Sequence, residues 1–170
     1  SCMNKHGIVA CDRCYQLCQH KCIDFSQKEE ILDLEVGTII VCTGSDVYDP
    51  TSLTELGYHR FPNVITALEF ERLINAGGPT GGNLIRPSDK KIPKSVGFLQ
   101  CIGSRSKRSN PYCSNICCMN TIKDALLIRE HWPDTKIYVF YMDIRAFGKG
   151  FEDLLMRARR EGVVFIRGIP

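Results

Sequence analysis

Hydrophobic positions in the second half of the chain follow strand-like and helix-like patterns in turn. Residues 96–101, 136–142 and 163–166 are short apolar runs that predict strands. Residues 114–131 and 150–161 repeat their apolar positions mostly three or four apart and predict helices. This alternating order is typical of a parallel sheet with right-handed crossovers, so we expect an α/β fold.

The first half contains one further strand candidate and one helix candidate. Residues 31–44 begin with alternating apolar and polar side chains, and residues 38–42 then form a continuous, mostly β-branched run. Such a run predicts a strand that is buried on both faces. Residues 66–75 predict a short helix, because Thr66 and Glu69 have the spacing of a capping box.

The composition is that of an ordinary globular protein. The 170 residues are 44% hydrophobic and 24% charged, which suits one domain or two small lobes with a core. A net charge of +3 gives no indication of nucleic-acid binding. The sequence contains neither a membrane-spanning apolar run nor a recognisable signal peptide, so we expect a cytoplasmic protein without membrane insertion.

Ten cysteines are the unusual feature of the sequence. In a reducing cytoplasm, clustered thiols favour metal binding over disulfides. The strongest group has the spacing C-x11-C-x3-C-C and consists of Cys101, Cys113, Cys117 and Cys118. Cys101 ends a predicted strand, and the last two cysteines fall in the first turn of the next helix. We therefore expect four sulfurs at the carboxyl edge of the sheet, where open α/β folds bind ligands.

Four thiolates in this place suit a 4Fe–4S cluster. Such a cluster carries about two negative charges when oxidised, and a helix N-terminus stabilises an anion. Arg105, Lys107 and Arg108 add positive charge in the same loop. Two alternatives stay open. Zinc also binds four thiolates, although adjacent ligands fit it poorly, and cysteines also serve as small apolar core residues.

A second, truncated ferredoxin-like group of cysteines lies near the N-terminus. Its members are Cys11, Cys14, Cys18 and Cys22. The spacing resembles the bacterial ferredoxin run C-x2-C-x2-C-x3-C, but Ile8 stands at the position of the first ligand. Cys2 is a further candidate ligand. We expect a second metal site in this segment, with either a cluster or zinc.

Several longer strings in the sequence are specific enough to indicate a family. They are residues 37–44 (GTIIVCTG), 63–73 (NVITALEFERL), 78–82 (GPTGG), 86–89 (RPSD), 100–105 (QCIGSR), 111–113 (PYC), 117–119 (CCM) and 141–150 (YMDIRAFGKG). In these strings the chain resembles the A subunit of heterodisulfide reductase. The resemblance extends over nearly the whole chain from about residue 23 onward.

The resemblance implies an iron–sulfur flavoprotein. It implies a Rossmann-like lobe of the thioredoxin-reductase type that binds FAD, interrupted by a ferredoxin-like insertion. It also assigns a 4Fe–4S cluster to the C-x11-C-x3-C-C pattern. In this family FAD accepts an electron pair and splits it between a high-potential and a low-potential path, which is electron bifurcation. The implied partners are a hydrogenase or formate dehydrogenase, ferredoxin, and the other subunits of a heterodisulfide reductase complex.

The resemblance also implies residues that bind FAD. Thr43 and Gly44 match a turn that approaches FAD, although a plain strand-ending glycine is an equal alternative for Gly44. Lys123 matches a catalytic position facing the flavin ring, where a cation stabilises a reduced anionic flavin; from the residues alone it is an exposed helix lysine. The resemblance also suggests that three residues after a predicted strand line the flavin or a partner; the alternative is a solvated loop. These residues are Asp143, Arg145 and Lys149.

We therefore expect three parts in the chain. Residues 1–25 are the remnant of the ferredoxin-like segment, residues 26–91 the end of an FAD-binding lobe with a linker, and residues 92–170 the Rossmann-like lobe with the cluster. The G-x-G-x-x-G turn of a dinucleotide site is missing. We accordingly expect FAD to be shared with another chain and this oxidoreductase subunit to be inactive alone. The alternatives are a pyridine-nucleotide oxidoreductase lobe and a zinc-binding or metal-free scaffold subunit.

Overall fold

The chain is divided into two units, Ser1–Gly44 and Ser45–Pro170, in a computed structural model that describes residues 12–169. In the described part of the first unit, the regular structure is one short helix, α1 (Arg13–Leu17). None of the helices in the described residues has the length and apolar character needed to cross a membrane. The division of the sequence into three parts stays a prediction.

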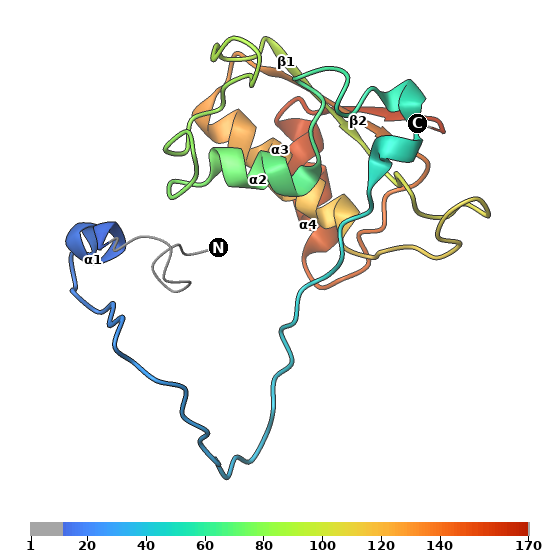
Figure 1. The fold of residues 1–170 in the computed structure, drawn as a ribbon. Helices are drawn as coiled ribbons and strands as arrows, with labels where there is room; N and C mark the ends of the chain where they lie inside the picture. Colours follow the sequence, from blue (N-terminus) through green and yellow to red (C-terminus); the bar gives the residue numbers. More distant parts are fainter. Residues whose placement is uncertain (1–11, 170) are drawn as a thin grey trace. The chain divides into compact units, whose positions relative to one another are not determined.

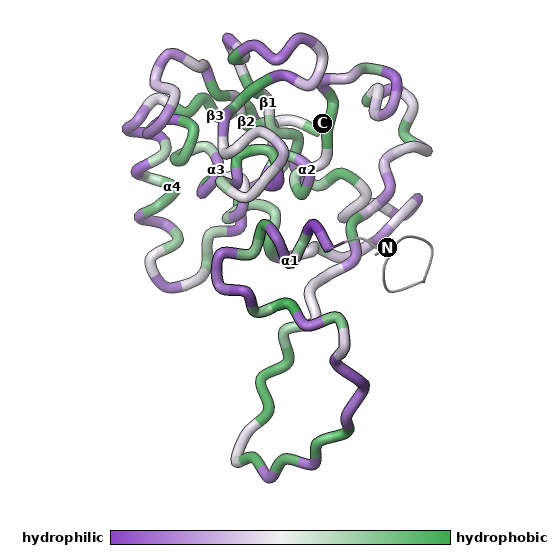
Figure 2. The backbone as a smooth tube through the Cα atoms, turned by 60° about the vertical axis from the view of Figure 1, so that its left-hand side comes forward, coloured by the Kyte–Doolittle hydropathy of each residue, from purple (hydrophilic) through white to green (hydrophobic). Residues whose placement is uncertain are grey.

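The prediction of a buried strand over residues 38–42 is wrong, because these residues are exposed coil. Ile39, Ile40 and Val41 are 78%, 83% and 75% exposed. Figure 2 shows hydrophobic stretches along this extended part of the chain. A strand buried on both faces needs hydrogen-bonded neighbours, and no strand among the described residues pairs with this segment. High β propensity does not by itself form a strand.

A parallel sheet of three strands lies at the centre of the second unit (Figure 1). Its strands are β1 (Ser95–Leu99), β2 (Lys136–Tyr141) and β3 (Val164–Arg167), in the spatial order β1-β2-β3. Val96 lies opposite Ile137, and Val139 lies opposite Phe165. The predicted α/β alternation with a parallel sheet is confirmed, whereas the Rossmann-like assignment stays a prediction.

Two helices pack against one face of this sheet. α3 (Cys117–His131) connects β1 to β2, α4 (Phe151–Arg160) connects β2 to β3, and the two helices contact each other (Figure 1). The fully buried core residues are Ile122, Ala125, Ile128, Ile137, Val139 and Ala158. α3 begins later than predicted, because Asn115 has a φ of +62°, a left-handed conformation that cannot continue a right-handed helix.

The opposite face of the sheet is only partly covered. Leu99, Val164 and Ile166 are 45%, 45% and 40% exposed. Phe140 of β2 lies between Leu99 and Ile166 in the register of the sheet, so the three side chains form one apolar row. Parallel sheets usually bury both faces, and this one leaves part of its apolar surface open to solvent.

α2 (Ala67–Ile74) confirms the predicted helix and its cap. The Thr66 hydroxyl accepts a hydrogen bond from the Glu69 N–H at 3.3 Å, and the Glu69 carboxylate accepts the Thr66 N–H at 2.7 Å. Phe70 is buried, and its ring meets that of Phe98 edge-on at 5.5 Å, which ties α2 to β1. Two short 3-10 turns precede the helix, η1 (Pro50–Ser52) and η2 (Thr54–Leu56).

Replacing Thr66 with alanine should destabilise the protein by about 1 kcal/mol, because the Glu69 N–H loses its acceptor. Thr66→Ser is the matched control, since serine keeps the capping hydroxyl. The free energy of unfolding from urea denaturation measures both effects. Equal stabilities of the alanine and serine variants would contradict the role of the cap.

Candidate metal centre

The segment that joins β1 to α3 forms a closed loop at the carboxyl edge of the sheet. The Arg105 N–H donates to the Tyr112 carbonyl at 3.0 Å, and the Ser106 N–H donates to the Asn110 carbonyl at 3.1 Å. These hydrogen bonds fold the middle of the loop back on itself. The loop therefore has a defined conformation between the strand and the helix that carry its cysteines.

Gly103 allows an aromatic ring to pack directly on this loop. It is buried with a φ of +69°, and a Cβ at this position would lie 2.3 Å from Cγ of Tyr48. A larger residue would displace the ring and would also be strained in this backbone conformation. Cys101 has a φ of +63°, which is uncommon for a residue other than glycine and is often found at functional sites.

The loop and the start of α3 position the four cysteines of the C-x11-C-x3-C-C pattern. Cys118 is buried, whereas the other three are half-buried. The Cys118 sulfur lies 3.9 Å from the Asp143 carbonyl oxygen. The Ser114 hydroxyl donates to the Cys117 sulfur at 3.4 Å, and the Asn115 N–H donates to the Cys113 sulfur, also at 3.4 Å. The sulfurs are thus surrounded by hydrogen-bonding groups of their own loop.

The protonation of these cysteines is strongly uneven. Hydrogen bonds from the Cys118 thiol, the Ser114 hydroxyl and backbone N–H groups lower the pKa of Cys117 well below its usual range. The hydrogen bond that Cys118 donates, together with burial, raises the pKa of Cys118. Burial also raises the pKa of Cys101, and the neighbouring charges of Cys117 and Cys113 add to this effect. Cys117 is therefore a thiolate at neutral pH, the form that binds metals.

The pKa values of Cys101, Cys117 and Cys118 thus depend on neighbouring cysteines of the same pattern. In the described part of the chain, no group of three or more His, Cys, Asp or Glu residues is arranged to hold a single metal ion. A 4Fe–4S cluster makes a different demand, because each thiolate binds a different iron. Four thiols, one already ionised, beside the free N–H groups of a helix start form a donor set that fits such an anionic cluster.

The N-terminal cysteine group is only partly described. Cys11, like Cys2, lies outside the described residues. Cys14 lies on α1, and the Cys18 N–H donates to its carbonyl oxygen at 3.1 Å. The sulfurs of Cys18 and Cys22 are 3.5 Å apart, and hydrogen bonds from Cys22 lower the pKa of Cys18. The structure therefore brings two of the four predicted sulfurs of this group together.

The residues that the family resemblance assigns to FAD are divided between the two units. Thr43 and Gly44 lie in the first unit and are exposed, and Gly44 has a φ of +75°. The others lie in the second unit. Three of them follow β2: Asp143, Arg145 and Lys149. In this loop the Asp143 carboxylate pairs with Arg105, and the Arg145 Nε lies 3.9 Å from it.

Lys123 joins α3 to α2 through ion pairs. Its ammonium group lies 2.8 Å from the Glu71 carboxylate and 3.1 Å from that of Asp124. Asp124 is 1% exposed, and burial raises its pKa to about 6 although Lys123 opposes the shift. Lys123 is thus a half-exposed cation beside two carboxylates, one of them buried.

Sequence analysis missed Asp124 and Glu71, and it named Arg105 only as a positive charge in the loop, without its partner Asp143. Asp124 falls on the apolar side of α3 between Ile122 and Ala125, and a charged residue at such a position is a signal that sequence reasoning can use. Glu71 and Arg105 carry no such signal, because their partners are distant in the sequence. Only the packing of α2 on α3, and of one loop on another, makes their roles visible.

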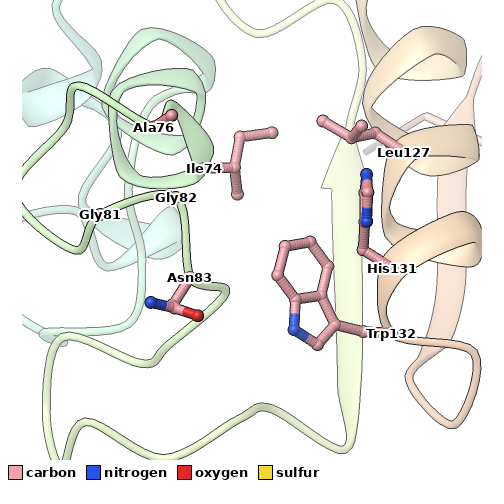
Figure 3. Close-up of a pocket in the computed structure, with 8 residues that line it drawn as sticks. All are labelled: Ile74, Ala76, Gly81, Gly82, Asn83, Leu127, His131 and Trp132. Atoms are coloured by element: carbon pink, nitrogen blue, oxygen red, sulfur yellow. The ribbon is translucent and has the colours of Figure 1, made fainter.

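A hollow of about 390 Å³ lies between the end of α2 and the end of α3 (Figure 3). Figure 3 shows Trp132 and Ile74 facing this space. A smaller recess of about 130 Å³ is lined by Glu71 and Lys123 and shares Ile74 and Leu127 with the hollow. The Lys123 ion pair therefore borders an open space rather than a packed interface.

Comparison with known proteins gives a consistent set of relatives, although no protein-family model matches the chain. The chain is 49% identical over 170 residues to the A subunit of the H(2):CoB-CoM heterodisulfide,ferredoxin reductase of Methanothermobacter thermautotrophicus, covering 99% of the chain and 26% of the relative. It is 56% identical over 150 residues to the iron-sulfur A subunit numbered 2 of the CoB--CoM heterodisulfide reductase of Methanopyrus kandleri, covering 87% and 23%. A Methanosarcina acetivorans relative, the A subunit of the Ferredoxin/F(420)H(2)-dependent CoB-CoM heterodisulfide reductase, is 43% identical over 161 residues, covering 94% and 20%.

The fold and the cysteine loop define an α/β protein with four cysteines at the carboxyl edge of its parallel sheet, and these relatives define its family. Identities of this size over nearly the whole chain show that it belongs to the family of heterodisulfide reductase A subunits. The resemblance stated from the sequence is therefore confirmed. The chain spans about a quarter of the length of the curated relatives it matches.

The raised pKa of Asp124 predicts a specific pH dependence of stability. The native state holds this proton up to about pH 6, whereas the unfolded chain releases it near pH 3.8. Between these values the native state binds more protons, so this group's contribution to the free energy of unfolding falls as the pH rises. The decrease amounts to about 3 kcal/mol.

Asp124→Asn should therefore be more stable relative to wild type at pH 7 than at pH 4. Urea denaturation at pH 4, 5, 6 and 7 measures the difference between the two proteins. The exposed Asp134→Asn substitution is the matched control and should leave the pH slope unchanged. A constant difference between Asp124→Asn and wild type across this range would contradict the prediction.

Proposed function

We propose that the protein is an iron–sulfur and flavin electron-transfer subunit of a heterodisulfide reductase-type complex. Its cluster site consists of Cys101, Cys113, Cys117 and Cys118. The observation that carries the proposal is the position of these four cysteines, in the loop that follows β1 and in the first turn of α3, at the carboxyl edge of a parallel sheet. The lowered pKa of Cys117 supports it. When bound, a 4Fe–4S cluster at this place accepts and releases single electrons.

The chain's own residues hold the cluster and tune it. Cys117 supplies a thiolate that is already formed, and the N–H groups at the start of α3 offset part of the cluster's negative charge. Cys118 lies furthest from solvent and holds the cluster against the sheet. The relatives support this chemistry, because one of them carries the words iron-sulfur subunit in its name.

FAD is the second cofactor of the proposal. In this proposal Lys123 lies beside the flavin ring and stabilises its reduced anionic form. The half-exposed ion pair of Lys123 with Glu71, at the edge of an open recess, supports this placement. The remaining proposed contacts to the flavin or a partner are Thr43, Gly44, Asp143, Arg145 and Lys149. In this proposal FAD is shared with another chain.

The proposed electron path follows the chemistry in the names of the relatives. Those names mention H(2), formate, ferredoxin and F(420)H(2) as reactants of the relatives and the CoB-CoM heterodisulfide as the group they reduce. For this protein we propose a hydrogenase or formate dehydrogenase as donor, with FAD splitting each electron pair between ferredoxin and a disulfide-reducing subunit. The N-terminal cysteines, Cys11, Cys14, Cys18 and Cys22, hold a second metal centre on this path.

Replacing Cys117 with alanine should remove about four irons per chain, because one cluster loses a ligand. Protein purified under anaerobic conditions should be brown, and iron, sulfide and zinc analysis measures its content. Cys42→Ala is the matched control, since Cys42 is exposed and lies outside both cysteine patterns. Zinc instead of iron in the wild-type protein would overturn the electron-transfer proposal in favour of a scaffold.

Replacing Lys123 with methionine in the assembled complex should lower the flavin reduction potential and leave the iron content unchanged. The reason is that the reduced anionic flavin loses its neighbouring cation. Lys136→Met removes an exposed lysine from β2 and serves as the control. A flavin potential equal to that of wild type would assign Lys123 a purely structural role between α2 and α3.

A further inference from the structure

Arg105 connects two loops that follow neighbouring strands. Its guanidinium forms a two-pronged ion pair with the Asp143 carboxylate, in which Nη2 lies 3.2 Å from Oδ2. Arg105 follows β1, and Asp143 follows β2, the parallel neighbour of β1. The Arg105 side chain is 24% exposed and the Asp143 side chain 49% exposed, so the pair is partly open to solvent on the carboxylate side. Paired guanidinium and carboxylate groups in this geometry form strong and specific hydrogen bonds.

The same ion pair contacts the cysteine loop on both sides. Arg105 directly follows a turn that starts at Cys101, in which the Ser104 N–H donates to the Cys101 carbonyl at 3.0 Å. From there the guanidinium opposes the effect of burial on the pKa of the Cys101 thiol. On the other side, the Asp143 backbone carbonyl is the acceptor that faces the Cys118 thiol at 3.9 Å. Arg105 is therefore close in the chain to the first cysteine of the pattern, and the backbone of Asp143 is close in space to the last.

We propose that Arg105 is a positioning residue that sets the reduction potential of the cluster, and that Asp143 limits its effect. This inference rests on the proposed cluster at Cys101, Cys113, Cys117 and Cys118. Reduction adds one electron to a group that is already negative, so a cation beside Cys101 stabilises the reduced form more than the oxidised form. The Asp143 carboxylate offsets this stabilisation.

The electrostatic role and a structural role predict different outcomes. A structural role predicts that Arg105→Gln and Asp143→Asn act alike, because each breaks the same ion pair. The electrostatic role predicts opposite shifts. Arg105→Gln removes the cation and lowers the potential, whereas Asp143→Asn removes the anion and leaves Arg105 and Arg145 unopposed, which raises the potential.

Redox titration of anaerobically prepared protein tests the proposal. The electron paramagnetic resonance signal of the reduced cluster is measured at each potential. Each substitution should change the one-electron equilibrium constant about tenfold, or about 59 mV, in opposite directions. Arg105→Lys should fall between wild type and Arg105→Gln, because it keeps the charge and loses the two-pronged geometry. Arg108→Gln, an exposed change of the same charge in the same loop, is the control and should shift the potential much less.

The outcomes separate this inference from the proposed function. Wild-type protein without iron at this loop would overturn the cluster and the inference with it. Normal iron content with unshifted potentials, or with both potentials shifted in the same direction, would overturn the role of Arg105 alone. If Arg105→Gln fails to retain the cluster, Asp143→Asn still decides, because only the electrostatic role predicts a raised potential in that variant.

Discussion

The parallel pairing of β1 with β2 is the constraint on which the rest of the site depends. Because both strands run in the same direction, the loops that follow them leave the sheet at the same edge. The loop after β1 carries Cys101 and Arg105, and the loop after β2 carries Asp143. The α3 helix must return to start the next strand, so its N-terminus, with Cys117 and Cys118, also lies at this edge. Four cysteines, one helix start and one ion pair thus lie on segments that this feature of topology brings to the same edge.

Two groups of charged side chains in the second unit lie near α3. At the cysteine loop, a guanidinium, a carboxylate and several thiols lie together. On the adjoining surface of α3, Lys123 lies between Glu71 and the buried Asp124. The two places share one helix: its first residues belong to the cysteine loop, and its middle carries the lysine. The proposed electron transfer between a cluster and a flavin would require these charged groups to be held on a rigid element, and the buried side of α3 makes this helix rigid.

The sequence predicted the local features and missed those that depend on distant partners. The capping box of Thr66 and Glu69, the three parallel strands and the placement of Cys117 at the start of a helix all follow from patterns a few residues long. The strand at residues 38–42 was predicted wrongly, because a buried strand depends on neighbours that no local pattern contains. Arg105 with Asp143, and Lys123 with Glu71, are 38 and 52 residues apart, so only the folded chain pairs them.

The exposed run at residues 38–42 affects how the protein can associate with other chains. Its β-branched side chains and free backbone groups are those of a strand without a neighbour, and such segments pair readily with identical segments of other molecules. The exposed run is therefore a segment of the described chain whose chemistry favours strand pairing.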